Sequence, residues 1–168
     1  MAKITQALED ILQGHQIKDF AMNWIENSNV NADELVENYN FLKEIGLTDG
    51  KIATLAQLLG RDPETIRGNY DNLKEIGLTD GKIASQAQLL GRDPETIRGN
   101  YDNLKEIGLT DGKIATLAQL LNFNSDTIRR HYDNLKEIGL TDGKIASRAE
   151  LLGLNPDTIR WNYDKLKE

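Results

Sequence analysis

The chain has 168 residues, of which 39% are apolar and none is cysteine, and its formal net charge is −7 at pH 7. The lack of cysteine excludes disulfides and thiolate chemistry. No apolar run approaches the roughly 18 residues of a membrane span, and no segment has the order of a signal peptide, so we expect a soluble cytoplasmic protein with no membrane partner.

Residues 1–44 predict an N-terminal capping helix followed by a degenerate first repeat. Residues 31–44 align without gaps to the second helix of the repeats described below. The two helices expected before it each have apolar residues at helical spacing. These residues are Ile4, Ala7, Leu8, Ile11 and Leu12 in the leading helix, and Phe20, Ala21, Trp24 and Ile25 in the next.

Residues 45–168 contain four copies of one block with a period of 31 residues. The stretch Ile45–Ala53 recurs from Ile76, from Ile107 and from Ile138. A period of about 20–50 residues indicates a solenoid, in which each repeat buries its apolar face against its neighbours. We therefore expect residues 45–168 to form one continuous array that follows the N-terminal segment 1–44.

Each repeat predicts two helices joined by a short turn. In residues 47–77, Thr48 is placed to cap a first helix of about 11 residues that ends at Gly60. Asp62 is placed to cap a second helix of about 13 residues, with Pro63 at its first position, and Gly77 ends it. The expected fold is all-α, an α-solenoid of tandem 31-residue helix-turn-helix repeats with about eleven helices in total.

Comparison of the repeats separates constant from variable positions. The constant columns that contain Ile52, Ala56, Leu59, Ile66 and Leu73 fit the core. A constant tyrosine column is expected to pack its rings in the core with the hydroxyls at the edge, although it could also form a stacking ladder for bases. This column consists of Tyr70, Tyr101, Tyr132 and Tyr163.

Two columns vary freely and are therefore expected to be exposed, where they could face a ligand or simply drift. One column is Gly68, Gly99, Arg130 and Trp161, with Glu37 before them, and the other is Leu55, Gln86, Leu117 and Arg148. Beside the first column lies a constant arginine column, with aspartates four residues further on that could form i, i+4 ion pairs. The arginines are Arg67, Arg98, Arg129 and Arg160, and the aspartates are Asp71, Asp102, Asp133 and Asp164.

Residues 146–166 resemble the DNA-binding helix-turn-helix family, which places a small residue four before a turn glycine and an aliphatic residue six after it. Here these residues are Ala149, Gly153 and Ile159, and the run of residues is similar to the Fis-type version. In that family the glycine adopts a positive φ, and exposed residues early in the second helix read bases. The resemblance assigns this role to Asp62, Glu64, Arg67 and Gly68, and to Asn155, Asp157, Arg160 and Trp161.

A partial resemblance links residues 73–83 to the repeats of mitochondrial transcription termination factors. The shared motif is Leu-Lys-x-Ile/Leu-Gly-Leu-Ser/Thr followed by an Ile, here Leu73 to Thr79 and then Ile83. Both resemblances cover most of residues 31–168 and imply nucleic-acid binding. Neighbouring second helices about 10 Å apart cannot each dock as independent units on B-DNA, whose major-groove face recurs every ~34 Å.

The sequence contains no catalytic, nucleotide-binding or metal-binding motif, so we expect neither an enzyme nor a cofactor, metal or small-molecule substrate. The leading hypothesis is a non-enzymatic repeat protein that binds DNA or RNA through its second helices. The candidate contacts are Arg67, Arg98, Arg129, Arg130, Arg160 and Trp161. The alternatives are a protein-binding scaffold, which the acidic residues 1–45 with 3 Lys/Arg and 8 Asp/Glu favour, and an engineered or recently amplified array without a natural ligand.

Overall fold

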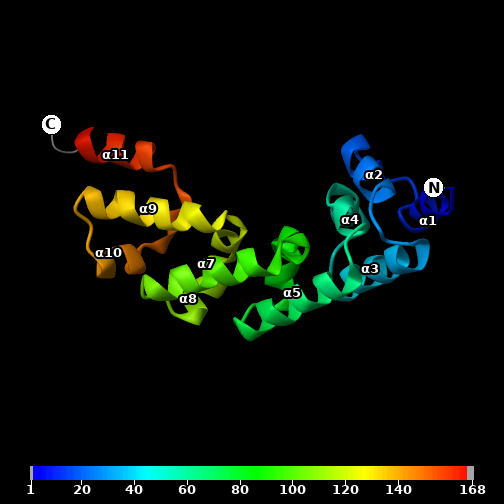
Figure 1. Cartoon of the computed structure of the whole chain (residues 1–168), viewed down its shortest axis with the longest axis horizontal. Coiled ribbons are helices and arrows are strands. Elements are labelled where there is room, and N and C mark those ends of the chain that lie inside the picture. The colour runs from blue at the N-terminus through cyan, green and yellow to red at the C-terminus, as the bar shows by residue number, and fades with distance from the viewer. Residues whose placement is uncertain (1, 166–168) are drawn as a thin grey trace. The chain divides into compact units, whose positions relative to one another are not determined.

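A computed structural model describes residues 2–165, including their side chains except those of Ala2, Asn162, Tyr163 and Lys165. Within this range the regular structure consists of eleven α-helices and four 3-10 helices, without a strand, which confirms the all-α repeat fold (Figure 1). The α-helices are α1 (Ala2–Ile11), α2 (Asp19–Glu26), α3 (Ala32–Glu44), α4 (Asp49–Thr54), α5 (Pro63–Glu75), α6 (Asp80–Ser85), α7 (Pro94–Glu106), α8 (Asp111–Thr116), α9 (Ser125–Glu137), α10 (Asp142–Ser147) and α11 (Pro156–Lys165). The 3-10 helices are η1 (Ala56–Leu58), η2 (Ala87–Gly91), η3 (Ala118–Asn122) and η4 (Ala149–Gly153).

The first helix of each repeat is broken, so the expectation of one continuous helix of about 11 residues is wrong. In the first copy, α4 ends after six residues and Leu55 leaves the helical region with φ −112° and ψ 32°. On an unbroken helix, at about 100° per residue, Leu58 would point roughly 120° away from Ile52. The 3-10 turn reorients it, and Leu58 is buried together with Leu59.

The predicted caps Thr48, Asp62 and Gly77 are confirmed, whereas Gly60 does not end a continuous first helix as a left-handed residue. The side chain of Thr48 accepts a hydrogen bond from the amide of Lys51, and Asp62 accepts one from the amide of Thr65. At the other end of α5, Gly77 has φ 101° and the amide of Leu78 donates to the carbonyl of Leu73 at 3.0 Å. This arrangement is a Schellman motif, which requires a residue that tolerates the left-handed conformation.

The helix-turn-helix resemblance predicts a positive φ for the turn glycines, and this prediction is wrong. Gly60, Gly91 and Gly153 do not have a positive φ. They are needed for close packing, because a Cβ on Gly91 would lie 2.6 Å from Cδ2 of Leu58, and one on Gly60 would lie 3.1 Å from Cα of Ile25. The glycine therefore lets the 3-10 helix of one repeat approach the preceding repeat.

The chain divides into two compact units, Met1–Arg92 and Asp93–Glu168. In the first unit, α1 packs on α3, α2 on η1, and α5 on η2. In the second unit, α9 lies beside α7 and also contacts η4 and α11 (Figure 1). The boundary falls between η2 and α7, so it lies inside a repeat.

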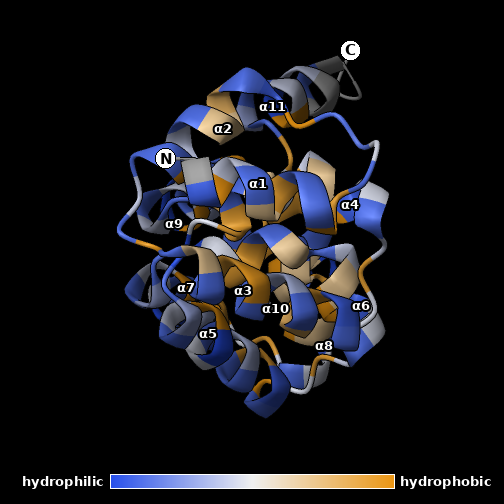
Figure 2. Cartoon of the chain, turned by 90° about the vertical axis from the view of Figure 1, so that its right-hand side faces the viewer, coloured by the Kyte–Doolittle hydropathy of each residue, from blue (hydrophilic) through white to orange (hydrophobic). Residues whose placement is uncertain are grey.

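The core follows the constant columns of the repeat. Ile52, Ala56, Leu59, Ile66 and Leu73 have 0% exposure, which confirms their predicted burial. The tyrosines of the constant column are only half-buried, except Tyr163, which lies outside the residues whose side chains are described. Figure 2 shows hydrophilic and apolar segments alternating along single helices such as α1 and α3, as expected for amphipathic helices.

Candidate nucleic-acid interface

Arg67 is held by two contacts inside the first unit. Its Nη2 bonds Oε1 of Glu37 at 3.0 Å, and its guanidinium lies 4.6 Å from the centre of the Phe41 ring. Both contacts come from α3, one repeat earlier in the chain. The positive charge of Arg67 is thereby balanced within the protein, which makes Arg67 the least suitable of the predicted contacts for binding a phosphate.

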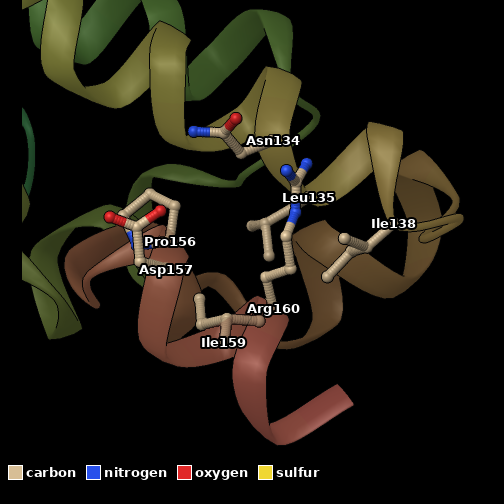
Figure 3. Close-up of a pocket in the computed structure, with 7 residues that line it drawn as sticks. All are labelled: Asn134, Leu135, Ile138, Pro156, Asp157, Ile159 and Arg160. Carbon is tan, nitrogen blue, oxygen red and sulfur yellow. The ribbon is translucent and has the colours of Figure 1, made fainter. Parts of the chain in front are cut away.

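Arg160 extends from α11 toward α9 (Figure 3). It borders a hollow of about 30 Å³ that Asn134, Leu135 and Ile138 also line, and its Nη2 bonds Oε2 of Glu137 at 2.9 Å. The side chains of Arg160 and Glu137 are 51% and 63% exposed. A surface ion pair of this kind contributes about 0–1 kcal/mol, so Arg160 can exchange Glu137 for another anion at little cost.

Arg98, Arg129 and Arg130 are exposed, and no ion pair joins them to a carboxylate among the described residues. Arg129 and Arg130 are adjacent on α9. Arg129 also borders a hollow of about 210 Å³ between α7 and α9. These two arginines are therefore available to an anionic ligand.

The prediction of i, i+4 ion pairs between the arginine and aspartate columns is wrong. Within residues 2–165 the ion pairs of this arginine column run instead to Glu37 and Glu137, both in the preceding repeat. A glutamate from a neighbouring helix reaches the guanidinium, and Asp71, Asp102, Asp133 and Asp164 stay exposed.

Trp161 is 63% exposed, the highest value among the large apolar side chains of the described residues. It occupies on α11 the position that Arg130 occupies on α9, and α9 and α11 are in contact. The structure thus groups Arg129, Arg130, Arg160 and Trp161 on two neighbouring helices of the second unit. Arg98 lies on α7 of the same unit, whereas Arg67 lies in the first.

A ladder of buried polar side chains joins each second helix to the next repeat, and the sequence analysis overlooked it. Asn100 is the clearest case, because its Nδ2 donates to the carbonyls of Leu121 and Phe123 at 3.1 and 2.6 Å. The equivalent residues are Asn38, Asn69 and His131. A polar residue that is nearly constant between apolar columns was the available signal for this structural role.

A second recurring network surrounds the half-buried tyrosines. In the first copy, Lys43 Nζ and Tyr39 Oη both bond Oδ1 of Asp49 at 2.8 Å. These bonds, first from Lys43 and then from Tyr39, hold the pKa of Asp49 below its usual range, and the bond to Asp49 raises the pKa of Tyr39. The same network recurs at Tyr70, Lys74 and Asp80, at Tyr101, Lys105 and Asp111, and at Tyr132, Lys136 and Asp142.

These tyrosines therefore have a structural role that uses their hydroxyls. Each network fastens the second half of a second helix to the first turn of the next repeat. The rings are half-buried and their polar edges are occupied, which favours the packing interpretation of the tyrosine column over a stacking ladder for bases.

The described residues contain no group of three or more His, Asp or Glu side chains that could hold a metal ion. No helix among them is long and apolar enough to cross a membrane. A third hollow, of about 290 Å³, lies among residues 5–22. All three hollows are below the size of about 300–1,000 Å³ at which small-molecule sites are usually found. Neither the protein-family models nor the curated proteins with which we compared the sequence gave a match.

Proposed function

We propose that this protein is a non-enzymatic helical-repeat protein that binds nucleic acid through the second helices of its second unit. The observation that carries the proposal is the surface formed by Arg129 and Arg130 on α9 and by Arg160 and Trp161 on α11, which we call the α9/α11 surface. Cationic side chains beside an exposed aromatic ring are the usual composition of a nucleic-acid contact.

The local charge on the α9/α11 surface supports this proposal despite the net charge of −7. The acidic excess lies in residues 1–45, and residues 108–138 carry four Lys/Arg and four Asp/Glu. Arg129 and Arg130 are adjacent, and within residues 2–165 neither forms an ion pair, although Glu106 and Asp133 line the same hollow as Arg129. Phosphate contacts made by such residues release condensed counterions and therefore depend on salt.

A second candidate function is a protein-binding scaffold. Its support is a pair of exposed aromatic side chains on α2, Phe20 at 60% and Trp24 at 45% exposure. Exposed aromatic residues are enriched at protein interfaces. An engineered or amplified array without a ligand is a further alternative, which the identical 13-residue sequences of α5 and α7 favour.

The test is a binding titration at several salt concentrations with the intact chain and two variants. We expect R129Q/R130Q to weaken binding and to reduce the slope of log K against log salt by about 1.4–1.8, as for two lost phosphate contacts. R67Q is the matched control, because Arg67 lies in the first unit and is held both by Glu37 and by the ring of Phe41. Equal loss in both variants, or a slope that R129Q/R130Q leaves unchanged, would contradict the proposed surface.

A further inference from the structure

We infer that the ligand of the α9/α11 surface is a single strand, one of whose unpaired bases stacks on Trp161. This inference rests on the proposed function and narrows it to one class of nucleic acid. Three features of the second helices support it: the position of Trp161, the location of the carboxylates and the spacing of the helices.

Trp161 is exposed because of its position on the helix. The equivalent residues Gly68 and Arg130 are also exposed, and a Cβ added to Gly68 would meet nothing within 4 Å. At Gly99, by contrast, a Cβ would lie 3.5 Å from Oγ of Ser125. This column is therefore open at Gly68, Arg130 and Trp161 but not in every described repeat. An indole at such a position presents its ring face to the solvent.

An exposed ring face suits an unpaired base. Stacking of a base on an aromatic side chain is worth about 1–3 kcal/mol and tolerates any base, because every base has a π-face. In a duplex the neighbouring base pairs already cover those faces. An indole that stacks on a base of a duplex would first have to separate two base pairs, whereas an unpaired base needs no such step.

The first turns of the second helices are acidic, which opposes docking in the manner of a helix-turn-helix. Such a motif inserts the start of its second helix between the phosphates of the major groove. Here those turns carry exposed carboxylates, and two of these, Asp62 and Asp93, also cap their helices. The other carboxylates are Glu64, Glu95, Asp126 and Asp157. The cations of α9 lie further along the helix, at Arg129 and Arg130.

The spacing of the helices also opposes docking of each second helix in the major groove of a duplex. Packed helices lie about 8–10 Å apart, whereas a groove of B-DNA returns to the same face only after ~34 Å. The cationic positions of α9 and α11 are therefore close enough to contact nearby nucleotides of one strand. Proteins that bind single strands combine cations along the backbone with rings that stack on bases, as this surface does.

The experiment uses the fluorescence of Trp161 in a W24F background, which leaves one tryptophan. The phenylalanine keeps an aromatic ring at the place where the guanidinium of Arg61 lies 4.8 Å from the centre of the Trp24 ring. The probes are (dT)12, (rU)12 and a 12-base-pair duplex, titrated at about 50 mM NaCl, where phosphate contacts are strong. We expect either single strand to quench Trp161 and to bind at least tenfold more tightly than the duplex.

In the same background, W161A should weaken single-strand binding by about 5–150-fold, the range that corresponds to one stacked base. Because this variant has no tryptophan, its binding and that of its controls are measured by the fluorescence anisotropy of a fluorescein-labelled (dT)12. F20A is the matched control, since it removes an equally exposed aromatic ring from α2, and it should leave binding unchanged. Duplex binding equal to or tighter than that of both single strands, or no effect of W161A, would overturn the inference while keeping the proposed function. Absence of binding to all three probes would overturn the proposed function itself.

Discussion

The hydroxyl of Tyr101 donates a 2.8 Å hydrogen bond to Oδ1 of Asp111, and Lys105 bonds the same oxygen at 2.9 Å. Tyr101 and Lys105 lie in the second half of α7, and Asp111 begins α8. One carboxylate oxygen therefore joins two consecutive helices through two donors. The arrangement recurs in three other copies, which makes it a regular link between successive repeats.

The pKa directions of these networks predict a stability plateau at intermediate pH. The lowered pKa of Asp111 gives stability that is present above its unfolded value of about 3.9 and is lost as the pH falls through the folded value. The raised pKa values of Tyr101 and Lys105 give stability that is present below about 10 and is lost as the pH rises. Urea unfolding midpoints measured across both regions should decline at each end.

A fourfold variant tests the source of that decline. D49N/D80N/D111N/D142N should flatten both ends of the profile, because the amide neither ionises nor attracts the lysine. The matched control D71N/D102N/D133N/D164N changes four exposed aspartates that form no ion pair among the described residues and should keep the shape of the wild-type profile. Identical profiles for the two variants would show that the networks do not determine the pH dependence.

The buried asparagine ladder predicts that two asparagines of α5 contribute very differently to the free energy of unfolding. Asn69 is 0% exposed and donates to three carbonyls, those of Leu89, Leu90 and Arg92, whereas Asn72 is exposed. N69A leaves these buried acceptors without their donor and should lower the free energy of unfolding by about 1–3 kcal/mol. N72A should change it by less than about 0.5 kcal/mol. Chemical denaturation measures both, and equal effects would exclude a structural ladder.

The fold was predictable from the sequence because its signals are local and repeated. Three signals each have one simple structural explanation: the period of 31 residues, Pro63 after Asp62, and Gly77 after a helical run. The break at Leu55 was not predictable, since Leu55 and Leu58 also fit the widened face of a continuous helix. It arises from contacts with neighbouring elements, where burial of Leu58 outweighs helix continuity.

The candidate site was predictable only in part, because contacts with neighbouring helices also decide which of its charges are paired. Position along the second helix indicated that Arg67, Arg129 and Arg160 would be exposed. Their ionic partners depend on which glutamate a neighbouring helix brings near, and the period does not contain that information. Arg67 meets Glu37, which lies 30 positions earlier, whereas Arg160 meets Glu137, which lies 23 positions earlier.

Two glycines of one repeat should respond to alanine with opposite signs. G91A places a methyl group 2.6 Å from Cδ2 of the buried Leu58 and should destabilise the protein by about 1–3 kcal/mol. G81A lies in α6 with open space around its Cβ and should stabilise it by about 0.4–1 kcal/mol. Thermal melts of the two variants give the comparison, and destabilisation by G81A would contradict the role assigned to packing.

Truncation of Leu104, which is fully buried, should lower the free energy of unfolding more than truncation of Tyr101, which is half-buried on the same helix α7. L104A removes a side chain with 0% exposure and should cost about 2–5 kcal/mol. Y101A should cost less, because the ring is half-buried, and Y101F should report the bond to Asp111 alone. Urea titrations of the three variants test this order, and a loss below about 0.5 kcal/mol for L104A would show that this stripe is not core.

The most direct test of the proposed function is the location of nucleic-acid contacts by NMR on the isotope-labelled chain. Titration with (dT)12 at about 50 mM NaCl, where phosphate contacts are strong, should shift the indole N–H of Trp161 and the amides of Arg129, Arg130 and Arg160 most. The amides of α3, which carries Glu37, should move little. Largest shifts on α2 near Phe20 and Trp24, or no shifts at all, would contradict binding of nucleic acid by the α9/α11 surface.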